Sequence, residues 1–208
     1  MGELTTRGTR YRLSFSVGGL FAKEALVAAP LFVQSHDWRA VRTAIDADNL
    51  LQARTVASAR RLASEVVQRL EELNVDEIAL LLDGTASERS YLMWTAACRR
   101  YDLLGEFAEE VVRERFLLLA PTLLPEHFDA FVRAKSVWHE ELSAAADSTL
   151  QRLRSNAYLM LREAGLLSGA GEILPSVLSP RVAEALQRRS PSDVRFFPTT
   201  IEATGGEG

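Results

Sequence analysis

The chain has 208 residues, of which 47% are hydrophobic and 25% charged, ordinary values for a globular protein in water. The formal net charge is −4, so nucleic-acid binding would need a local basic patch, because the molecule as a whole is not attracted to phosphate. The single Cys98 excludes an internal disulfide and a zinc site built from cysteines, and no apolar run approaches the roughly 20 residues of a membrane-spanning helix. The composition predicts a cytoplasmic protein without a membrane span.

The first part of the chain, residues 1–120, is predicted to be an all-helical domain. Residues 11–16 alternate as a short extended segment does, and Gly18-Gly19 ends that pattern. Apolar residues then recur at three- and four-residue spacing, with Asp37 as one N-cap, Thr85 or Ser87 as another, and a break expected near Gly105. Helices are expected over residues 20–32, 37–47, 55–73, 75–82, 85–101 and 103–119.

A second domain is predicted over residues 121–198, because Pro121 and Pro125 bracket a short connection. Three helices follow one another in this domain, and Ser179-Pro180 begins a last helix that ends near Gln187. The three helices are expected over residues 126–135, 138–146 and 148–164.

The segment after the third helix has the pattern of a small β-hairpin. Leu166-Leu167-Ser168 and Glu172-Ile173-Leu174 flank a Gly169-Ala170-Gly171 turn. Three helices followed by a hairpin predict a winged helix-turn-helix, so the whole chain is expected to be mainly α with one short hairpin wing. Residues 199–208 contain too little apolar surface to order themselves and are predicted to be a disordered tail.

The helix expected over 148–164 is the candidate nucleic-acid site. Asp147 and Ser148 are expected to cap its first turn, and Gly165 favours the left-handed conformation that ends a helix. One side of the helix is apolar, and the other side carries groups that can contact phosphates and base edges. That polar face comprises Gln151, Arg152, Ser155, Tyr158, Leu159 and Arg162. The predicted DNA-binding residues on this helix are Thr149, Gln151, Arg152, Ser155 and Arg162.

Arginines of the first domain are the second candidate. Arg54 and Arg61 lie seven residues apart on one predicted helix and therefore point the same way, and Arg99 and Arg100 form a basic pair. Two readings stay open for both groups. The arginines contact phosphate, or they belong to solvated helix faces. In the second reading Glu65 and Glu71 balance the cluster of Arg54, Arg60 and Arg61, and Asp102 and Glu106 pair with Arg99 and Arg100.

Catalytic and metal-binding patterns are missing from the sequence. His36, His127 and His139 stand at none of the short metal-ligand spacings, and neither glycine pair fits a phosphate-binding loop. Cys98 shares a helix face with Tyr91, Trp94 and Tyr101, which predicts a buried aromatic stripe and not a nucleophile. The sequence therefore predicts a protein that is not an enzyme and that binds no metal or other cofactor.

Six segments carry a more specific pattern. They are Tyr11–Leu20, Asn49–Thr55 with Ser58 and Arg61, Cys98–Tyr101 with Glu106-Phe107, Phe128–Phe131, Ser148–Leu167 and Leu178–Arg181. In this order, from about residue 11 to residue 198, they resemble the BrxA family of bacterial BREX phage-defence systems.

The resemblance implies a non-enzymatic accessory protein that binds double-stranded DNA. It also implies an N-terminal helical domain similar to NusB, an RNA-binding antitermination factor, and a C-terminal winged helix. Arg54, Arg61, Arg99 and Arg100 stand at family-like positions, and no catalytic residue is implied. Two alternatives stay open: an adaptor that docks onto other BREX proteins, and RNA binding through the NusB-like bundle. Glu172, near the tip of the expected wing, has the wrong sign for phosphate.

Overall fold

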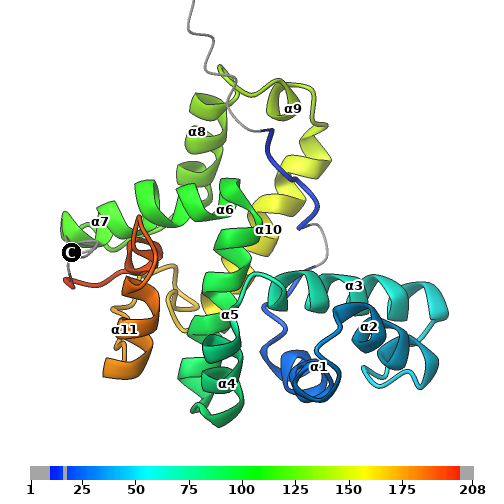
Figure 1. Ribbon diagram of the computed structural model, residues 1–208. Helices are drawn as coiled ribbons and strands as arrows, with labels where there is room; N and C mark the ends of the chain where they lie inside the picture. The colour runs from blue at the N-terminus through cyan, green and yellow to red at the C-terminus, as the bar shows by residue number, and fades with distance from the viewer. Residues whose placement is uncertain (1–9, 16–17, 202–208) are drawn as a thin grey trace, which may run out of the picture.

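The computed structural model of the protein describes residues 10–15 and 18–201. Figure 1 shows that these residues are almost entirely helical, which confirms the predicted mainly α class. The N-terminal helices are α1 (Ala22–Ser35), α2 (Trp38–Ala47), α3 (Val56–Leu70), α4 (Val75–Asp83) and α5 (Ala86–Arg100).

Side-chain caps explain where these helices begin. The Asp37 carboxylate accepts the N–H of Arg39 at the start of α2, as predicted. At the start of α5, Thr85 and Glu88 bond each other's backbone N–H groups, so Thr85 and not Ser87 is the cap. Such reciprocal bonds satisfy two of the N–H groups that a first helical turn leaves without an intrahelical partner.

Helix α5 lies at the centre of the fold and packs on α1, α3, α4, α6 and α10 (Figure 1). Trp94 is fully buried, and its indole N–H donates to the Phe196 carbonyl over 2.9 Å. Tyr91, Cys98 and Tyr101 are also buried, which confirms the predicted aromatic stripe as core.

The next helical stretch begins at Asp102, so the chain breaks at Tyr101 and not near Gly105 as predicted. Tyr101 has an extended backbone (φ −123°, ψ 93°), whereas Gly105 lies inside α6. A Cβ at Gly105 would stand 2.9 Å from the Cys98 carbonyl oxygen, so this glycine permits close packing of α6 on α5. The stretch comprises α6 (Asp102–Phe107), the π-helical turn η1 (Ala108–Arg113) and α7 (Glu114–Leu117).

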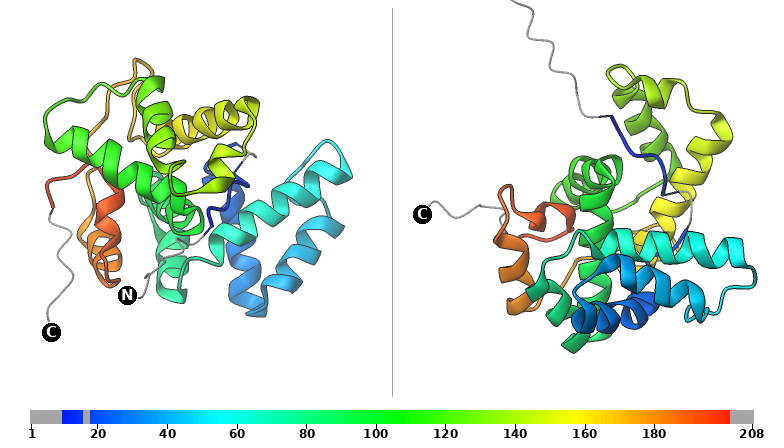
Figure 2. Two further views of the ribbon diagram at one scale, coloured as in Figure 1. Left: turned by 90° about the horizontal axis from the view of Figure 1, so that it is seen from above. Right: turned by 45° about the vertical axis from the view of Figure 1, so that its right-hand side comes forward.

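The C-terminal elements form two groups. Helices α8 and α9 lie at the upper side of Figure 1 and α10 runs from there to the centre, whereas α11 and η2 lie beside α4 and α5 in Figures 1 and 2. Helix α9 is shorter than the predicted 138–146, because the chain first turns back at Lys135, whose carbonyl accepts the N–H groups of Trp138 and His139. The bounds are α8 (Pro125–Lys135), α9 (Glu140–Ser143), α10 (Asp147–Glu163), α11 (Pro180–Gln187) and the 3-10 turn η2 (Asp193–Phe196).

The predicted hairpin wing is wrong. Within the described residues, the segment after α10 forms isolated antiparallel bridges, Leu167 with Ile173 and Thr122 with Glu172, and no strand. The backbone groups of this turn bond to two different segments of the chain. The Ile173 N–H donates to the Pro121 carbonyl over 2.7 Å, whereas Glu172 accepts the Ser168 N–H over 2.8 Å. The two flanking segments are joined by the Ser168 bond and by the Leu174 N–H donating to the Leu166 carbonyl over 2.9 Å, and these bonds define one bridge and no continuous ladder.

Contacts cross the predicted domain boundary at residue 120 in both directions. The Tyr11 ring stacks on His139 beside α9, and Arg181 at the start of α11 bonds Glu88 at the start of α5. One cluster of buried hydrophobic residues runs through both predicted domains, and the division at residue 120 stays a prediction. Of the predicted tail, Thr199 is buried, and residues 202–208 lie outside the described part of the chain.

Candidate nucleic-acid interface

Helix α10 begins without the side-chain cap that the sequence predicted. Its N-cap is Ala146, whose carbonyl accepts the N–H groups of Thr149 and Leu150, and Asp147 is already the first helical residue. An acidic side chain in the first turn still interacts favourably with the helix dipole. The predicted end is confirmed: Gly165 has φ +71°, a conformation that glycine adopts without strain.

One edge of α10 is covered by the N-terminal segment. The Asn156 amide donates to the Phe15 carbonyl over 2.8 Å, and the Glu163 carboxylate accepts the Leu20 N–H. Because Asn156 and Glu163 stand seven residues apart, residues 15 and 20 are joined to the same side of α10. The N-terminal segment thus covers the edge of α10 that carries Asn156 and Glu163 and narrows the exposed surface of the helix.

The opposite edge of α10 packs on α8 and on the connection before it. Tyr158, predicted on the polar face, is buried, and its hydroxyl donates to the Leu124 carbonyl. Burial raises the pKa of Tyr158 to about 12, so the hydroxyl keeps its proton for this bond. Arg154 pairs with Asp129 of α8. Tyr158 is therefore a packing residue, which corrects its placement on the polar face.

Between these two edges, α10 leaves an exposed strip that we call the α10 face: Gln151, Arg152, Ser155 and Arg162. At about 100° per residue these four positions fall on one side of the helix. Within the described chain, no hydrogen bond or ion pair holds the guanidinium of Arg152 or of Arg162. Thr149 is only half-buried and lies at the margin of this face, beside the N-terminal segment.

The N-terminal segment adds two arginines that the sequence analysis did not select. Tyr11 and Phe15 point inward and are buried, whereas Arg10 and Arg12 alternate with them and are exposed. Side chains of an extended segment point alternately to opposite sides, and this alternation was the signal that would have found both arginines. Neither guanidinium pairs with another group in the described residues.

Arg54 and Arg61 are exposed, but the structure does not bring them to α10. Helix α3, which carries Arg61, packs on α1, α2 and α5 and leads away from α10 in Figures 1 and 2. Their proposed acidic neighbours are engaged elsewhere: Glu65 is buried and accepts the Tyr101 hydroxyl, and Glu71 pairs with Arg42 of α2. Neither carboxylate therefore balances Arg54 or Arg61.

A groove of about 510 Å³ lies between α2 and α3 and is lined by more arginines than acids. Arg60 pairs there with Asp46 over 3.1 Å, as a solvated helix face predicts, whereas Arg39 is exposed and has no side-chain partner among the described residues. Arg42 completes the group. The spacing of Arg39 and Arg42, three residues apart on a helix whose Val41 is buried, was an available sequence signal.

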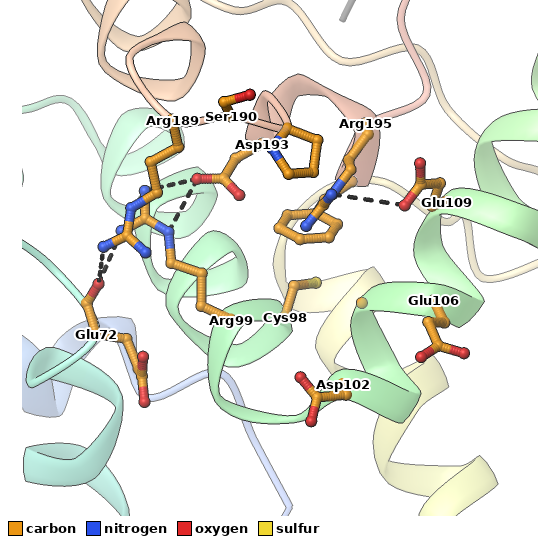
Figure 3. A pocket seen from close by; sticks show the side chains of 13 residues that line it. Glu72, Cys98, Arg99, Asp102, Glu106, Glu109, Arg189, Ser190, Asp193 and Arg195 are labelled. Atoms are coloured by element: carbon orange, nitrogen blue, oxygen red, sulfur yellow. Dashed lines mark hydrogen bonds and ion pairs between the residues drawn. The ribbon is translucent and has the colours of Figure 1, made fainter. Parts of the chain in front are cut away.

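Arg99 is the clearest departure from the predicted site, as Figure 3 shows. Its side chain is only 4% exposed, and its guanidinium bonds Glu77 over 2.5 Å, Asp193 over 2.8 Å and the Glu72 carbonyl over 2.8 Å. Burial alone would raise the pKa of Glu77. Hydrogen bonds from the Arg99 guanidinium and from the Asn74 backbone N–H outweigh burial and hold this pKa below its ordinary value. Arg99 is thus a buried structural cation with no donor turned to solvent for phosphate.

Neither arginine of the pair has the predicted partners Asp102 and Glu106. Arg100 is partly exposed, donates to the Gln68 amide oxygen over 2.9 Å and lies 3.6 Å from the Glu72 carboxylate. The partners of both arginines come from segments that lie far away in sequence, which nearest-neighbour reasoning cannot identify.

The pocket of Figure 3, about 420 Å³, is lined mainly by charged groups that already have partners. Arg189 donates to the Glu72 carbonyl, and Arg195 lies 3.5 Å from Glu109. Cys98 lies at its wall, and burial raises the pKa of this thiol well above its ordinary value, so the reactive thiolate is disfavoured. Over residues 10–15 and 18–201, no three histidine, cysteine or acidic side chains are grouped to hold a metal ion.

Comparison with known proteins points to one family. The family model described as BrxA matches residues 9–190. A "BREX protein BrxA" from Paramagnetospirillum magneticum is 27% identical over 159 residues, which are 76% of this chain and 80% of that protein. A "BREX protein BrxA" from Escherichia coli O9:H4 is 26% identical over 179 residues, covering 85% of this chain and 84% of that protein. These matches confirm the resemblance found in the sequence.

A solved structure has the same fold. The crystal structure of an uncharacterized protein from Magnetospirillum magneticum superposes with a TM-score of 0.76 at 24% identity, covering 91% of this chain and 98% of that one. At this identity the likeness speaks for the fold alone. None of the helices within the described ranges has the length and hydrophobicity needed to cross a bilayer.

Proposed function

The chain belongs to the BrxA family of BREX phage-defence systems, and from this premise we propose that it binds double-stranded DNA in the cytoplasm as a non-enzymatic component of such a system. The α10 face carries the proposal: Arg152 and Arg162 lie exposed without ion-pair partners among residues 10–15 and 18–201, with Gln151 and Ser155 beside them. In this reading α8, α9 and α10 act as a helix-turn-helix unit, with α10 as the helix that enters the major groove.

The dimensions of the α10 face fit a groove. Arg152 and Arg162 stand ten residues apart, which is about 15 Å along the axis at 1.5 Å per residue. The major groove is about 12 Å wide, so the two guanidinium groups can reach phosphates on its two sides while Gln151 and Ser155 face the base edges. Phosphate contacts position a protein on the duplex, and only the base contacts read sequence. Because only Gln151 and Ser155 of the α10 face are left for base contacts, we expect weak sequence preference.

The charge distribution supports a local contact and not attraction of the whole molecule. The net charge is −4, but Arg10 and Arg12 lie on the N-terminal segment, whose Phe15 carbonyl bonds Asn156 of α10, the helix that carries Arg152 and Arg162. Glu163 is the nearest acid on the helix, and it already accepts the Leu20 N–H. Exposed charges act over about 10 Å at ordinary ionic strength, so nearby arginines outweigh distant acids.

The test is a titration of a labelled duplex by fluorescence anisotropy at low and at raised salt, with RNA and single-stranded DNA as competitors. We expect the logarithm of the affinity to fall linearly with the logarithm of salt, with a slope of about 0.9 per phosphate contact. Duplex binding that is absent, or that does not change with salt, would contradict the proposal. Stronger competition by RNA than by unlabelled duplex would favour RNA as the ligand over double-stranded DNA.

A second candidate function is an adaptor for another BREX protein, and one observation favours it. Leu118 and Leu119, directly after α7, are 74% and 89% exposed, and Leu117 before them is also exposed. Neighbouring exposed apolar side chains often mark a protein contact. If Leu118→Ser abolishes phage defence while duplex affinity is unchanged, the adaptor function holds. Loss of defence in an Arg152→Gln variant alone would favour DNA binding.

A further inference from the structure

We propose that Trp138, at the turn between α8 and α9, stacks on an unpaired or opened base of the bound DNA. This inference rests on the proposed function and adds a base-stacking site to it. Trp138 is 83% exposed, whereas Trp94 is fully buried and Trp38 stacks on Phe32 at 3.9 Å. It is the most exposed aromatic side chain among the described residues, and nothing in the fold accounts for its exposure.

The backbone holds Trp138 in a fixed place. The N–H groups of Trp138 and His139 both donate to the Lys135 carbonyl, over 3.0 and 3.1 Å. The His139 ring stacks on Tyr11 with centroids 3.8 Å apart, and the Tyr11 N–H donates to Glu141 of α9. An aromatic ring on a held backbone loses little conformational freedom when it binds, as rigid aromatic anchors in binding surfaces do.

The segments that meet at this turn carry arginines. Arg10 and Arg12 flank Tyr11, which contacts His139, and Arg133 lies exposed in the last turn of α8. No described group pairs with these three guanidinium groups. Lys135 contributes no free charge, because it is paired with Glu106 and Glu110. Of the acids at this turn, Glu106 and Glu110 bind Lys135 and Glu141 accepts the Tyr11 N–H, which leaves the exposed Glu140 beside three arginines without partners in the described residues.

An exposed aromatic among cations complements a nucleic acid, because the ring takes the base and the arginines take the phosphates. The N-terminal segment connects this turn to the α10 face: Tyr11 lies on His139, and the Phe15 carbonyl lies on Asn156 of α10. Arg12 stands between these two contacts. A DNA strand that leaves the α10 face along Arg12 would therefore reach Trp138. Only Val137 accompanies Trp138 as an exposed apolar neighbour at this turn, a small area for a membrane or protein contact.

The stacking step also predicts which DNA is preferred. A base inside an intact duplex is stacked on its neighbours, so Trp138 must either open a base step or take a base that is already unpaired. Opening a base step costs free energy, and this cost is absent when the base is already unpaired. We therefore expect tighter binding to a duplex with a single-base bulge than to the fully paired duplex of the same sequence.

The test uses the full chain, a bulged duplex and the matching paired duplex. Trp138→Ala should weaken binding to the bulged duplex by about fivefold to a hundredfold, the range of one aromatic–base stack, and should abolish the preference for the bulge. The salt dependence should not change, because no charge is lost. Trp138→Phe should retain part of the preference. Tryptophan emission of the wild type should be quenched by the bulged duplex, and Trp138→Phe should lose this quenching.

The control is Arg12→Gln, which should lower the salt slope without removing the quenching. If Trp138→Ala binds both duplexes as wild type does while Arg152→Gln weakens both, the stacking proposal is wrong and the proposed DNA-binding function stands. If wild type binds neither duplex, both are wrong. Two further outcomes would overturn stacking in favour of another partner. In each, Trp138→Ala keeps its DNA affinity but loses either self-association or binding to vesicles that contain anionic lipid.

Discussion

Two arginine-bearing regions of this molecule differ in what surrounds them. Arg99 is buried between Glu77 and Asp193 and donates to both carboxylates, whereas Arg152 and Arg162 stand exposed on α10 without an ion-pair partner in the described chain. Residue type and helix position alone did not separate them, since all were predicted to contact DNA. Burial and partners decide the role, so Arg99 should matter for folding and the α10 face for binding.

The largest effect should come from removing the buried cation. Arg99→Ala leaves Glu77 and Asp193, whose side chains are 1% and 3% exposed, without their counter-charge. Breaking a buried ion pair on one side typically costs about 3–5 kcal/mol. Since a domain has roughly 5–15 kcal/mol in total, we expect poor expression or a strongly lowered midpoint in urea unfolding. A midpoint equal to that of wild type would show that the network is not structural.

The same contrast exists between two tryptophans. Trp94→Ala removes a fully buried ring and its bond to the Phe196 carbonyl, and such truncations cost about 3–5 kcal/mol. Trp138→Ala removes a ring that is 83% exposed and should change the free energy of unfolding by no more than about 0.5 kcal/mol. Thermal unfolding of both variants checks this. Equal losses of stability would contradict the different roles assigned to them.

Acid should weaken the buried network selectively. The folded-state pKa of Glu77 is below its ordinary value, so its contribution to stability is fully present above the unfolded pKa of about 4.3 and is lost as the pH falls through the folded pKa. Glu77→Gln should be less stable than wild type at neutral pH, and the difference should shrink as the pH falls below about 4. Urea midpoints across this range provide the measurement. A difference that stays constant would exclude this linkage.

Local patterns predicted much of the fold but little of the buried ionic network. Asp37, Thr85 and Gly165 act where the sequence placed them, because caps and helix ends depend on residues within one turn. The partners of Arg99 lie 22 and 94 residues away, and no periodicity reveals such pairs. The bond from Ile173 to Pro121 is likewise a contact between segments far apart in sequence, which the hairpin pattern of residues 166–174 did not reveal.

The candidate interface was predictable in part. The polar side of the helix that became α10 was identified from spacing alone, and Gln151, Arg152, Ser155 and Arg162 are exposed. Tyr158 was placed on that side because the angular pattern cannot show that Leu124 packs against it. The position of Arg10 and Arg12 depends on tertiary contacts of their segment, such as the Tyr11 ring with His139 and the Phe15 carbonyl with Asn156.

The smallest expected effect on stability belongs to the α10 face, where function should respond instead. The Arg152→Gln, Arg162→Gln double variant removes exposed charges, so its thermal midpoint should equal that of wild type. Arg188→Gln is a suitable control, because Arg188 is an exposed arginine at the C-cap of α11 that already pairs with Glu184 and Asp76. This variant removes one charge that lies outside the α10 face.

The most direct test of the central claim is the salt dependence of duplex binding by that double variant. Each lost phosphate contact should lower the slope of log affinity against log salt by about 0.9, so the double variant should lose about 1.8 and Arg188→Gln should keep the wild-type slope. A double variant that binds duplex with the wild-type slope and affinity would contradict DNA binding through the α10 face.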